Sequence, residues 1–149
     1  MSKNKKPKNE TQEYLSQIRL YDTHIRNKLA DLANMEDLAL KITSVLKPVS
    51  SARTGEVHDK VGDAASEIVD LQQALKKDIG MYRKKKEAIT SVIDQVKDAR
   101  ELDVLQSCYV LHKDLVQVAY DMGYSYKNIC RIHGRALQTV EGLIKEQKC

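Results

Sequence analysis

Apolar residues in the first third of the chain recur at alternating steps of four and three. The series is interrupted once, at Lys28, and consists of Tyr14, Ile18, Tyr21, Ile25, Leu32, Met35, Ala39, Ile42 and Leu46. Such a heptad seam is typical of a helix that packs along its whole length in coiled-coil fashion. The pattern predicts a helix over 10–46, which at 1.5 Å per residue would be about 55 Å long and needs a partner helix.

A second heptad seam follows after a break. Pro48 ends the helix and the stretch 49–56, VSSARTGE, has the composition of a loop, so we expect a loop over 47–57. The next apolar series predicts a helix over 58–97, and its members are Val61, Ala64, Ile68, Leu71, Leu75, Ile79, Tyr82, Ile89, Val92 or Ile93, and Val96. Because the connection is short, the two helices are expected to form an antiparallel hairpin over 10–97; the same seams could instead pair two chains.

The last third of the chain has the spacing of a helix-turn-helix motif. Ala119 is a small residue where two helices would cross, and Gly123 stands at the tight turn between them. Ser125 can cap the helix that follows the turn. Apolar residues fill all five positions of the wedge between the helices, namely Val118, Met122, Tyr124, Ile129 and Ile132. The pattern predicts a helix-turn-helix domain over 98–144.

Three short helices are expected within this domain, over 100–111, 114–122 and 125–144. The whole chain is therefore predicted to be all-α: a long, coiled-coil-like antiparallel hairpin followed by a three-helix unit. Outside it, we expect a disordered basic tail over 1–9 and a frayed tail over 145–149.

The second helix of the motif carries the candidate binding residues. Lys127, Arg131 and Arg135 are spaced four apart, and the stretch 124–140 contains no Asp or Glu. This spacing places the three bases along one helical face. The candidate DNA-binding set is Ser125, Tyr126, Lys127, Asn128, Arg131 and Arg135. Arginine suits a guanine edge and asparagine an adenine edge, while lysine and arginine also contact phosphates. The alternative interpretation is a solvated basic face.

The amino-acid composition indicates a soluble protein and says little more about its function. The 25 Lys and Arg exceed the 21 Asp and Glu to give a net charge of +4, and the chain has no Phe or Trp. No apolar run has the length of a membrane span, and the N-terminus lacks a hydrophobic signal core. We expect a soluble protein in the cytoplasm, without contact with a membrane. A basic cluster over 76–86 is interpreted as a solvated face, with a phosphate contact as the alternative.

The three cysteines, Cys108, Cys130 and Cys149, are too few and too scattered for a disulfide framework, so reduced thiols are expected. Cys108 with His112 and Cys130 with His133 could together hold zinc, but packing of the helices already accounts for them and is the favoured interpretation. The sequence contains no phosphate-binding glycine loop and no catalytic signature. We therefore expect neither an enzyme nor a bound cofactor or metal.

The segment 100–137 resembles region 4 of bacterial RNA polymerase sigma factors. The resemblance rests on Leu102, Leu105 and Tyr109, on Val118-Ala119 and Met122-Gly123-Tyr124-Ser125, and on His133-Gly134-Arg135-Ala136-Leu137. With the hairpin, the chain is similar to phage- and prophage-encoded ArpU/RinA-like transcriptional regulators of Gram-positive bacteria. Two features depart from the sigma pattern: no aromatic-rich segment could melt a promoter, and Leu111-His112-Lys113 stand where a glycine is common.

The resemblance implies a regulator that binds promoter DNA through the second helix of the motif and activates phage genes in the bacterial host cell. Double-stranded DNA is then the main partner and RNA polymerase a further candidate. A homodimer through the hairpin would raise the affinity of a small unit. Two other functions remain open: a protein-interaction module that docks polymerase or a regulator, and a phage DNA-packaging recognition subunit.

Overall fold

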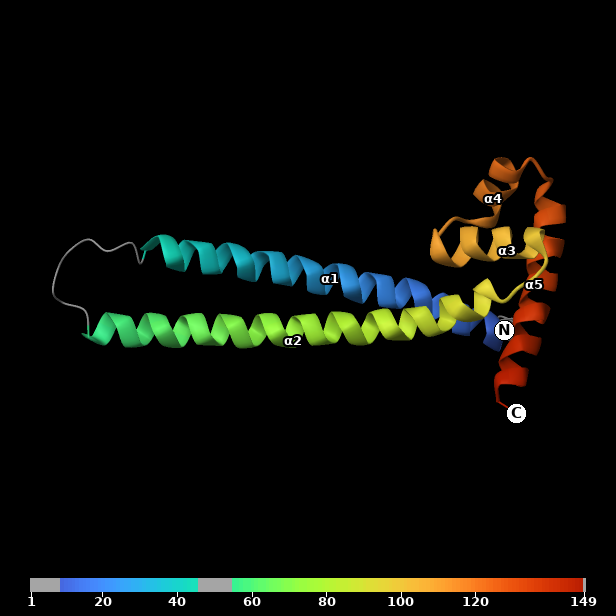
Figure 1. The fold of residues 1–149 in the computed structure, drawn as a ribbon. Coiled ribbons are helices and arrows are strands. Elements are labelled where there is room, and N and C mark those ends of the chain that lie inside the picture. The colour runs from blue at the N-terminus through green and yellow to red at the C-terminus, as the bar shows by residue number, and fades with distance from the viewer. Residues whose placement is uncertain (1–8, 46–54, 149) are drawn as a thin grey trace, which may run out of the picture. The chain divides into compact units, whose positions relative to one another are not determined.

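The computed structural model describes residues 9–45 and 55–148, with side chains described for 9–44 and 62–148. The described residues form helices and no strand, which confirms the all-α prediction (Figure 1). The elements are α1 (Glu10–Val45), α2 (Gly55–Asp94), α3 (Ala99–Leu105), the π-helical turn η1 (Gln106–Val110), α4 (Leu115–Met122) and α5 (Tyr126–Gln147). Most of the expected loop, and the expected tail before Asn9, lie outside the described residues.

The chain divides into two compact units. One unit, Thr23–Arg83, contains the greater part of α1 and of α2, and we call it the hairpin unit. The other contains the chain up to Asp22 and from Lys84 onward, and we call it the helix-turn-helix unit. It includes the first turns of α1 and the last turns of α2. The expected hairpin, 10–97, thus contributes to both units.

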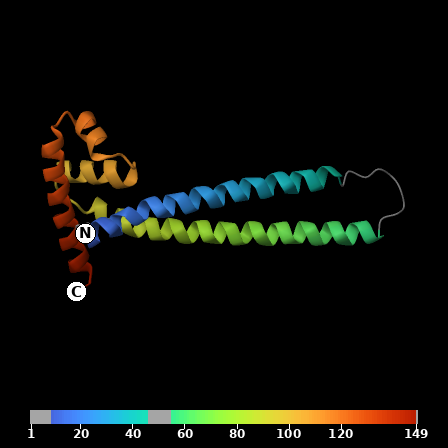
Figure 2. The same ribbon diagram turned by 180° about the vertical axis from the view of Figure 1, so that it is seen from behind.

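In the hairpin unit, α1 and α2 lie side by side and antiparallel, as both views show (Figure 1, Figure 2). Every described seam position of α1 in this unit is partly buried, including Lys28. Lys28 forms an ion pair with Asp78 of α2 at 3.4 Å, and the His24 ring stacks on Tyr82 at 4.9 Å. A polar residue in the seam is tolerated here because the facing helix supplies its partner.

The prediction for Leu71 is wrong. Leu71 is 49% exposed, and the neighbouring Gln72 takes the partly buried position. The phase of α2 is set by Leu75 and Ile79, and three residues before Leu75 is Gln72. The prediction followed apolar residues along the helix, so it placed the apolar Leu71 in the seam where the structure has the neighbouring Gln72.

The helix-turn-helix unit contains two clusters of buried apolar side chains. The first joins the later half of α5 to the hairpin base, by which we mean the first turns of α1 and the last turns of α2 within this unit. Its members are Leu15, Ile18, Ile89, Val92, Ile93, Val96, Leu105, Tyr109, Ala136, Leu137 and Val140. The second lies among α3, α4 and the first turns of α5: Val104, Val118, Ala119, Ile129 and Ile132. The short helices therefore do not pack on one another alone, because α5 also packs on the base of the hairpin.

Several helix ends differ from the expected positions. Asn9 does not belong to a tail, because its side chain caps α1 by accepting a hydrogen bond from the Thr11 backbone N–H at 3.0 Å. α2 already begins at Gly55 and ends at Asp94, and α5 continues to Gln147, through part of the expected C-terminal tail. The first short helix begins at Ala99, where Asp98 caps it, and becomes π-helical at Gln106.

The turn before α4 contains a histidine in the left-handed region. His112 has φ 58°, where a residue with a Cβ is strained. Its side chain is held by Asp22 of α1, whose Oδ2 lies 2.7 Å from His112 Nε2. The other carboxylate oxygen of Asp22 lies 2.6 Å from Lys86 Nζ of α2. This cluster, which we call the Asp22 clamp, links α1, α2 and the turn before α4.

The charge of Asp22 is stabilised by its two neighbours. Burial alone would raise the pKa of Asp22, but the hydrogen bonds and positive charges of Lys86 and His112 outweigh it and lower that pKa. The folded state therefore favours the carboxylate, and this stabilisation is present above the unfolded pKa of about 3.9. It is lost as the pH falls through the lowered pKa of the folded state.

We expect two substitutions of His112 to separate backbone strain from side-chain contact. His112→Ala removes the contact with Asp22 and keeps the strain, so it should lower the free energy of unfolding by about 1 kcal/mol or more. His112→Gly removes the contact and relieves the strain, so it should be about 1 kcal/mol more stable than the alanine variant. Urea denaturation followed by circular dichroism measures both. Equal stability of the two variants would show that position 112 is not strained.

Candidate nucleic-acid interface

The turn between α4 and α5 has the geometry that the sequence pattern predicts. Gly123 ends α4 with φ 69°, in the left-handed region that glycine adopts without strain. The backbone N–H of Gly123 donates to the Tyr120 carbonyl at 3.2 Å, and that of Tyr124 donates to the Ala119 carbonyl at 3.0 Å. These bonds satisfy the last carbonyls of α4 and turn the chain into α5.

Both helices of the motif are capped at their N-termini. The Asp114 side chain accepts a hydrogen bond from the Gln117 backbone N–H at 2.8 Å. Ser125 caps α5 by accepting from the Asn128 backbone N–H at 3.1 Å, as its position in the motif predicts. Ser125 thus has a structural role at the start of α5.

The wedge residues lie between the two helices as expected. Val118, Ala119, Ile129 and Ile132 are buried, while Met122 and Tyr124 are partly buried and pack against them. Further along, Ala136, Leu137 and Val140 bury the same side of α5 against the hairpin base. A hydrogen bond from the Thr139 hydroxyl to Glu101 Oε2 at 2.9 Å adds a polar link to α3.

The opposite side of α5 is exposed and basic. Lys127, Arg131 and Arg135 are all exposed, and none of them forms an ion pair with another residue of the described chain. The first turn of α5 contains no acidic residue. The partial positive charge at a helix N-terminus adds to these side chains. The structure therefore brings the three predicted bases together on one open surface, which we call the basic face.

The two other candidate residues differ in accessibility. Tyr126 is 55% exposed, and a hydrogen bond with Cys130, one turn further along α5, raises the pKa of Tyr126. Asn128 is partly buried, and its backbone N–H is already engaged by Ser125. Tyr126 is thus available to a ligand through its ring, while Asn128 lies closer to the packed side of the helix.

The two acidic residues at α4, Asp114 and Asp121, form hydrogen bonds within their own segment of the chain. Asp114 caps α4, as described above. Asp121 accepts from Lys113 Nζ at 2.9 Å and from Gln117 Nε2 at 2.8 Å, and these bonds lower its pKa. Their negative charge is therefore partly balanced locally, which leaves the basic face with an excess of positive charge.

The four residues considered for zinc make other contacts. His112 is bonded to Asp22, His133 to Tyr109, and Cys130 to Tyr126. Burial, with the charge of Asp114, raises the pKa of the Cys108 thiol to about 11, so the thiolate that zinc requires is disfavoured. Within the described residues, no group of three or more His, Cys, Asp or Glu side chains could hold a metal ion.

The contact between Tyr109 and His133 was not predicted from the sequence. The Tyr109 hydroxyl lies 2.7 Å from His133 Nε2, and the two rings stack with centroids 5.8 Å apart. Burial raises the pKa of Tyr109 and lowers that of His133, so the folded protein favours the neutral form of both groups. The pair connects η1 to α5 beneath the basic face.

Comparisons with protein-family models, with curated proteins and with solved structures found no match for this chain. The resemblance to sigma region 4 and to ArpU/RinA-like regulators therefore stays a prediction. Within the described residues, none of the helices combines the length and apolar character needed to cross a membrane.

The buried His133 predicts a loss of stability in mild acid. Its pKa in the folded state lies below the ordinary 6.5, so between these two values the unfolded chain binds a proton that the folded chain does not. The free energy of unfolding should fall as the pH decreases below 6.5, by at most about 1.4 kcal/mol per pH unit from this group. The variant His133→Asn should show a shallower slope in urea titrations between about pH 5 and 7. Equal slopes would contradict the assignment.

Proposed function

We propose that this chain binds double-stranded DNA through the basic face of α5 and regulates transcription. The observation that carries the proposal is the division of α5 into two sides. One side is buried in two apolar clusters, and the other presents Lys127, Arg131 and Arg135 without an acidic residue among them. A helix held rigidly on one side and basic on the other is suited to the major groove.

Each exposed side chain has a distinct proposed role. Arg131 lies one turn into α5 and would read a guanine edge with its two parallel donors. Lys127 and Arg135 flank it and would contact phosphates, which fixes position and gives salt-dependent affinity. Tyr126 is placed to contact the DNA backbone or a base, and Asn128 remains a candidate for an adenine edge.

The regulatory role rests on the resemblance described above. It suggests a phage-encoded regulator that acts at promoters in the bacterial cytoplasm, with activation as the expected outcome. One small helix-turn-helix unit makes few contacts, so tight binding is expected to need two copies.

A second candidate function, docking of a protein on α4, is favoured by a separate observation. Three large apolar residues at or beside α4 are exposed: Leu111 at 60%, Val116 at 65% and Tyr120 at 84%. Val116 and Tyr120 are four apart and so share one helical face. This surface differs from the basic face, so the two functions are separable by mutation.

The DNA proposal is tested with the full-length chain and an unbiased DNA probe. Preferred duplexes are selected from a random-sequence library, and the affinity for the selected and a scrambled duplex is then measured by fluorescence anisotropy. We expect a preference of tenfold or more, about 1.4 kcal/mol. The double variant Arg131→Ala, Arg135→Ala should lose it. Arg135→Ala alone should reduce the slope of log affinity against log salt by about 1.

Lys145→Ala is the matched control, because it also removes one positive charge from α5. Lys145 lies 14 residues beyond Arg131, about 21 Å along the helix, and is paired with Glu141. We expect it to leave DNA binding unchanged. If the wild-type chain binds neither duplex at about 50 mM salt, the DNA proposal is wrong. Variants of Val116 and Tyr120 would then be used to test protein docking.

Two glycines on the exposed side of α5 allow a second test. A methyl group at Gly134 or Gly142 would meet nothing within 4 Å, so alanine at either position should raise the free energy of unfolding by about 1 kcal/mol. Gly134 lies among the three bases, whereas Gly142 lies beyond them. Gly134→Ala should therefore weaken DNA binding several-fold, while Gly142→Ala should only stabilise the fold. Equal affinity of both variants would show that DNA does not approach Gly134 closely.

A further inference from the structure

Several large apolar residues of the hairpin unit are exposed. Among its described side chains only Ile68 and Ile79 are buried, whereas six large apolar residues are between 42% and 68% exposed: Leu29, Leu38, Leu40, Val69, Leu71 and Met81. Two paired helices bury their common seam and leave the flanks of that seam in water. Further helices are needed to cover such flanks, as in a four-helix bundle.

Helical spacing assigns these residues to two different flanks. At 100° per residue, one side of the α1 seam carries Leu29, Ala33, Glu36 and Leu40, and the same rotational side of α2 carries Val69, Lys76 and Arg83. Because the helices are antiparallel, these two sets lie on one face of the hairpin, which we call the Leu40 flank. The opposite face, the Leu38 flank, carries Asp31 and Leu38 of α1 with Glu67, Leu71 and Asp78 of α2.

Charge distinguishes the two flanks. The Leu38 flank carries the acids Asp31, Glu67 and Asp78 and no base of its own, although Lys28 reaches Asp78 from the seam. A second copy placed on it would bring acid against acid. The Leu40 flank has its bases, Lys76 and Arg83, toward one end and its acid, Glu36, further along. An antiparallel second copy would bring base against acid.

The hairpin unit as a whole shows the same separation of charge, with bases toward one end and acids toward the other. The residues 31–44 and 62–72 contain six acids and one base, Lys41. The residues 23–30 and 76–83 contain five bases and one acid, Asp78. The intervening 45–61 adds three bases and two acids by sequence, which leaves the acidic sign of that half unchanged. Two such hairpins attract each other when they lie antiparallel and repel when they lie parallel.

We propose that a second copy of this chain packs antiparallel on the Leu40 flank, forming a two-fold symmetric four-helix assembly. The contacts Lys28–Asp78 and His24–Tyr82 fix the register of α1 and α2, and they place Lys76 level with Ala30 and Val69 level with Asp37. With the two-fold axis near Ala33, Glu36 lies level with Lys76 of the partner subunit, and Leu29 lies level with Val69 of the partner subunit, in each case on the diagonally placed helix. Ala33 is small enough to meet its own copy closely.

The apolar part of the proposal is tested with a matched pair of leucines. The oligomeric state of the full-length chain is measured without DNA by sedimentation equilibrium over a wide concentration range. Leu29→Ser should weaken the dimer at least tenfold, whereas Leu38→Ser, on the opposite flank, should leave it unchanged. Both leucines are already exposed in the single chain, so both variants should keep their helical circular dichroism.

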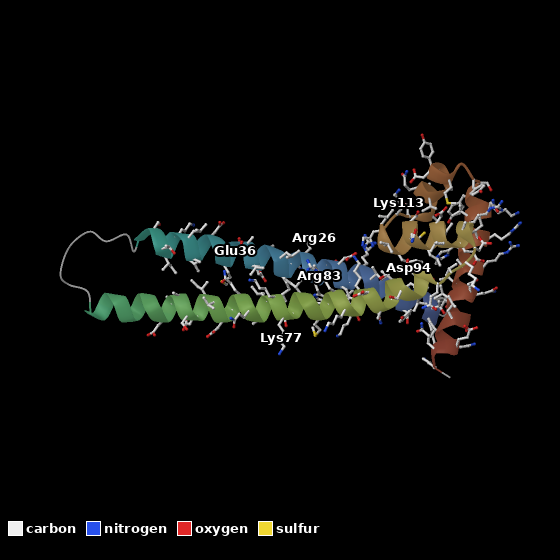
Figure 3. The ribbon with its side chains drawn as sticks, in the orientation of Figure 1. Arg26, Glu36, Lys77, Arg83, Asp94 and Lys113 are labelled. Carbon is white, nitrogen blue, oxygen red and sulfur yellow. The ribbon has the colours of Figure 1, made fainter. Side chains whose placement is uncertain are left out.

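The orientation is tested by reversing charges. Glu36→Lys and Lys76→Glu should each weaken the dimer about tenfold, because the two-fold axis repeats each repulsive pair. The double variant Glu36→Lys, Lys76→Glu should restore it, because the paired charges are then exchanged. Lys77→Glu is the matched control, since Lys77 points away from α1 on the outer side of α2 (Figure 3).

Several results would overturn this proposal. A chain that stays monomeric at every concentration excludes the dimer, and a dimer that is indifferent to Leu29→Ser uses another surface. A parallel dimer would not show weakening by single charge reversals followed by restoration in the double variant. None of these measurements involves DNA, so their failure would be distinct from a failure of the DNA-binding proposal.

Discussion

The position of the basic face depends on the burial of a single stripe along α5. Ile129 and Ile132 pack into the cluster shared with α4, and Ala136, Leu137 and Val140 pack against the hairpin base. Each fully buried large apolar side chain contributes about 1.5–3 kcal/mol. The orientation of the helix is thus set by contacts on one side only. The side chains of Lys127, Arg131 and Arg135 take no part in these contacts, so they are available for binding.

Two left-handed residues bracket α4 and fix its direction. Gly123 at its end adopts φ 69° without strain, whereas His112 before its start adopts φ 58° despite its side chain. The Asp22 clamp offsets this strain by holding the imidazole against α1 and α2. A contact between distant segments thus supports a backbone conformation that glycine adopts without strain.

Local pattern predicted most of the fold and of the site. The seam of α1, the wedge residues, the Ser125 cap and the exposure of Lys127, Arg131 and Arg135 all follow from periodicity or from turn chemistry, and the structure shows each of them. These features depend on residues within a few positions of one another.

The features that sequence reasoning missed depend on distant residues. Tyr109 meets His133 across 24 positions, and Asp22 meets His112 across 90, so no local spacing signals either pair. The wrong assignment of Leu71 has a related cause. The choice between two neighbouring phases of a helix is made by the facing helix, and hydrophobicity alone does not record it.

The ion pairs between α1 and α2 have a consequence for the alignment of the two helices. A purely apolar seam would allow one helix to slide past the other by a heptad with little penalty. Such a slip would move Lys28 from Asp78 to Leu71 or Lys85, and Asp22 from Lys86 to Ile79 or Ile93. Each alternative leaves a charge against an apolar or like-charged side chain. The two ion pairs therefore favour the observed alignment over a slip by one heptad, at some expense of apolar burial.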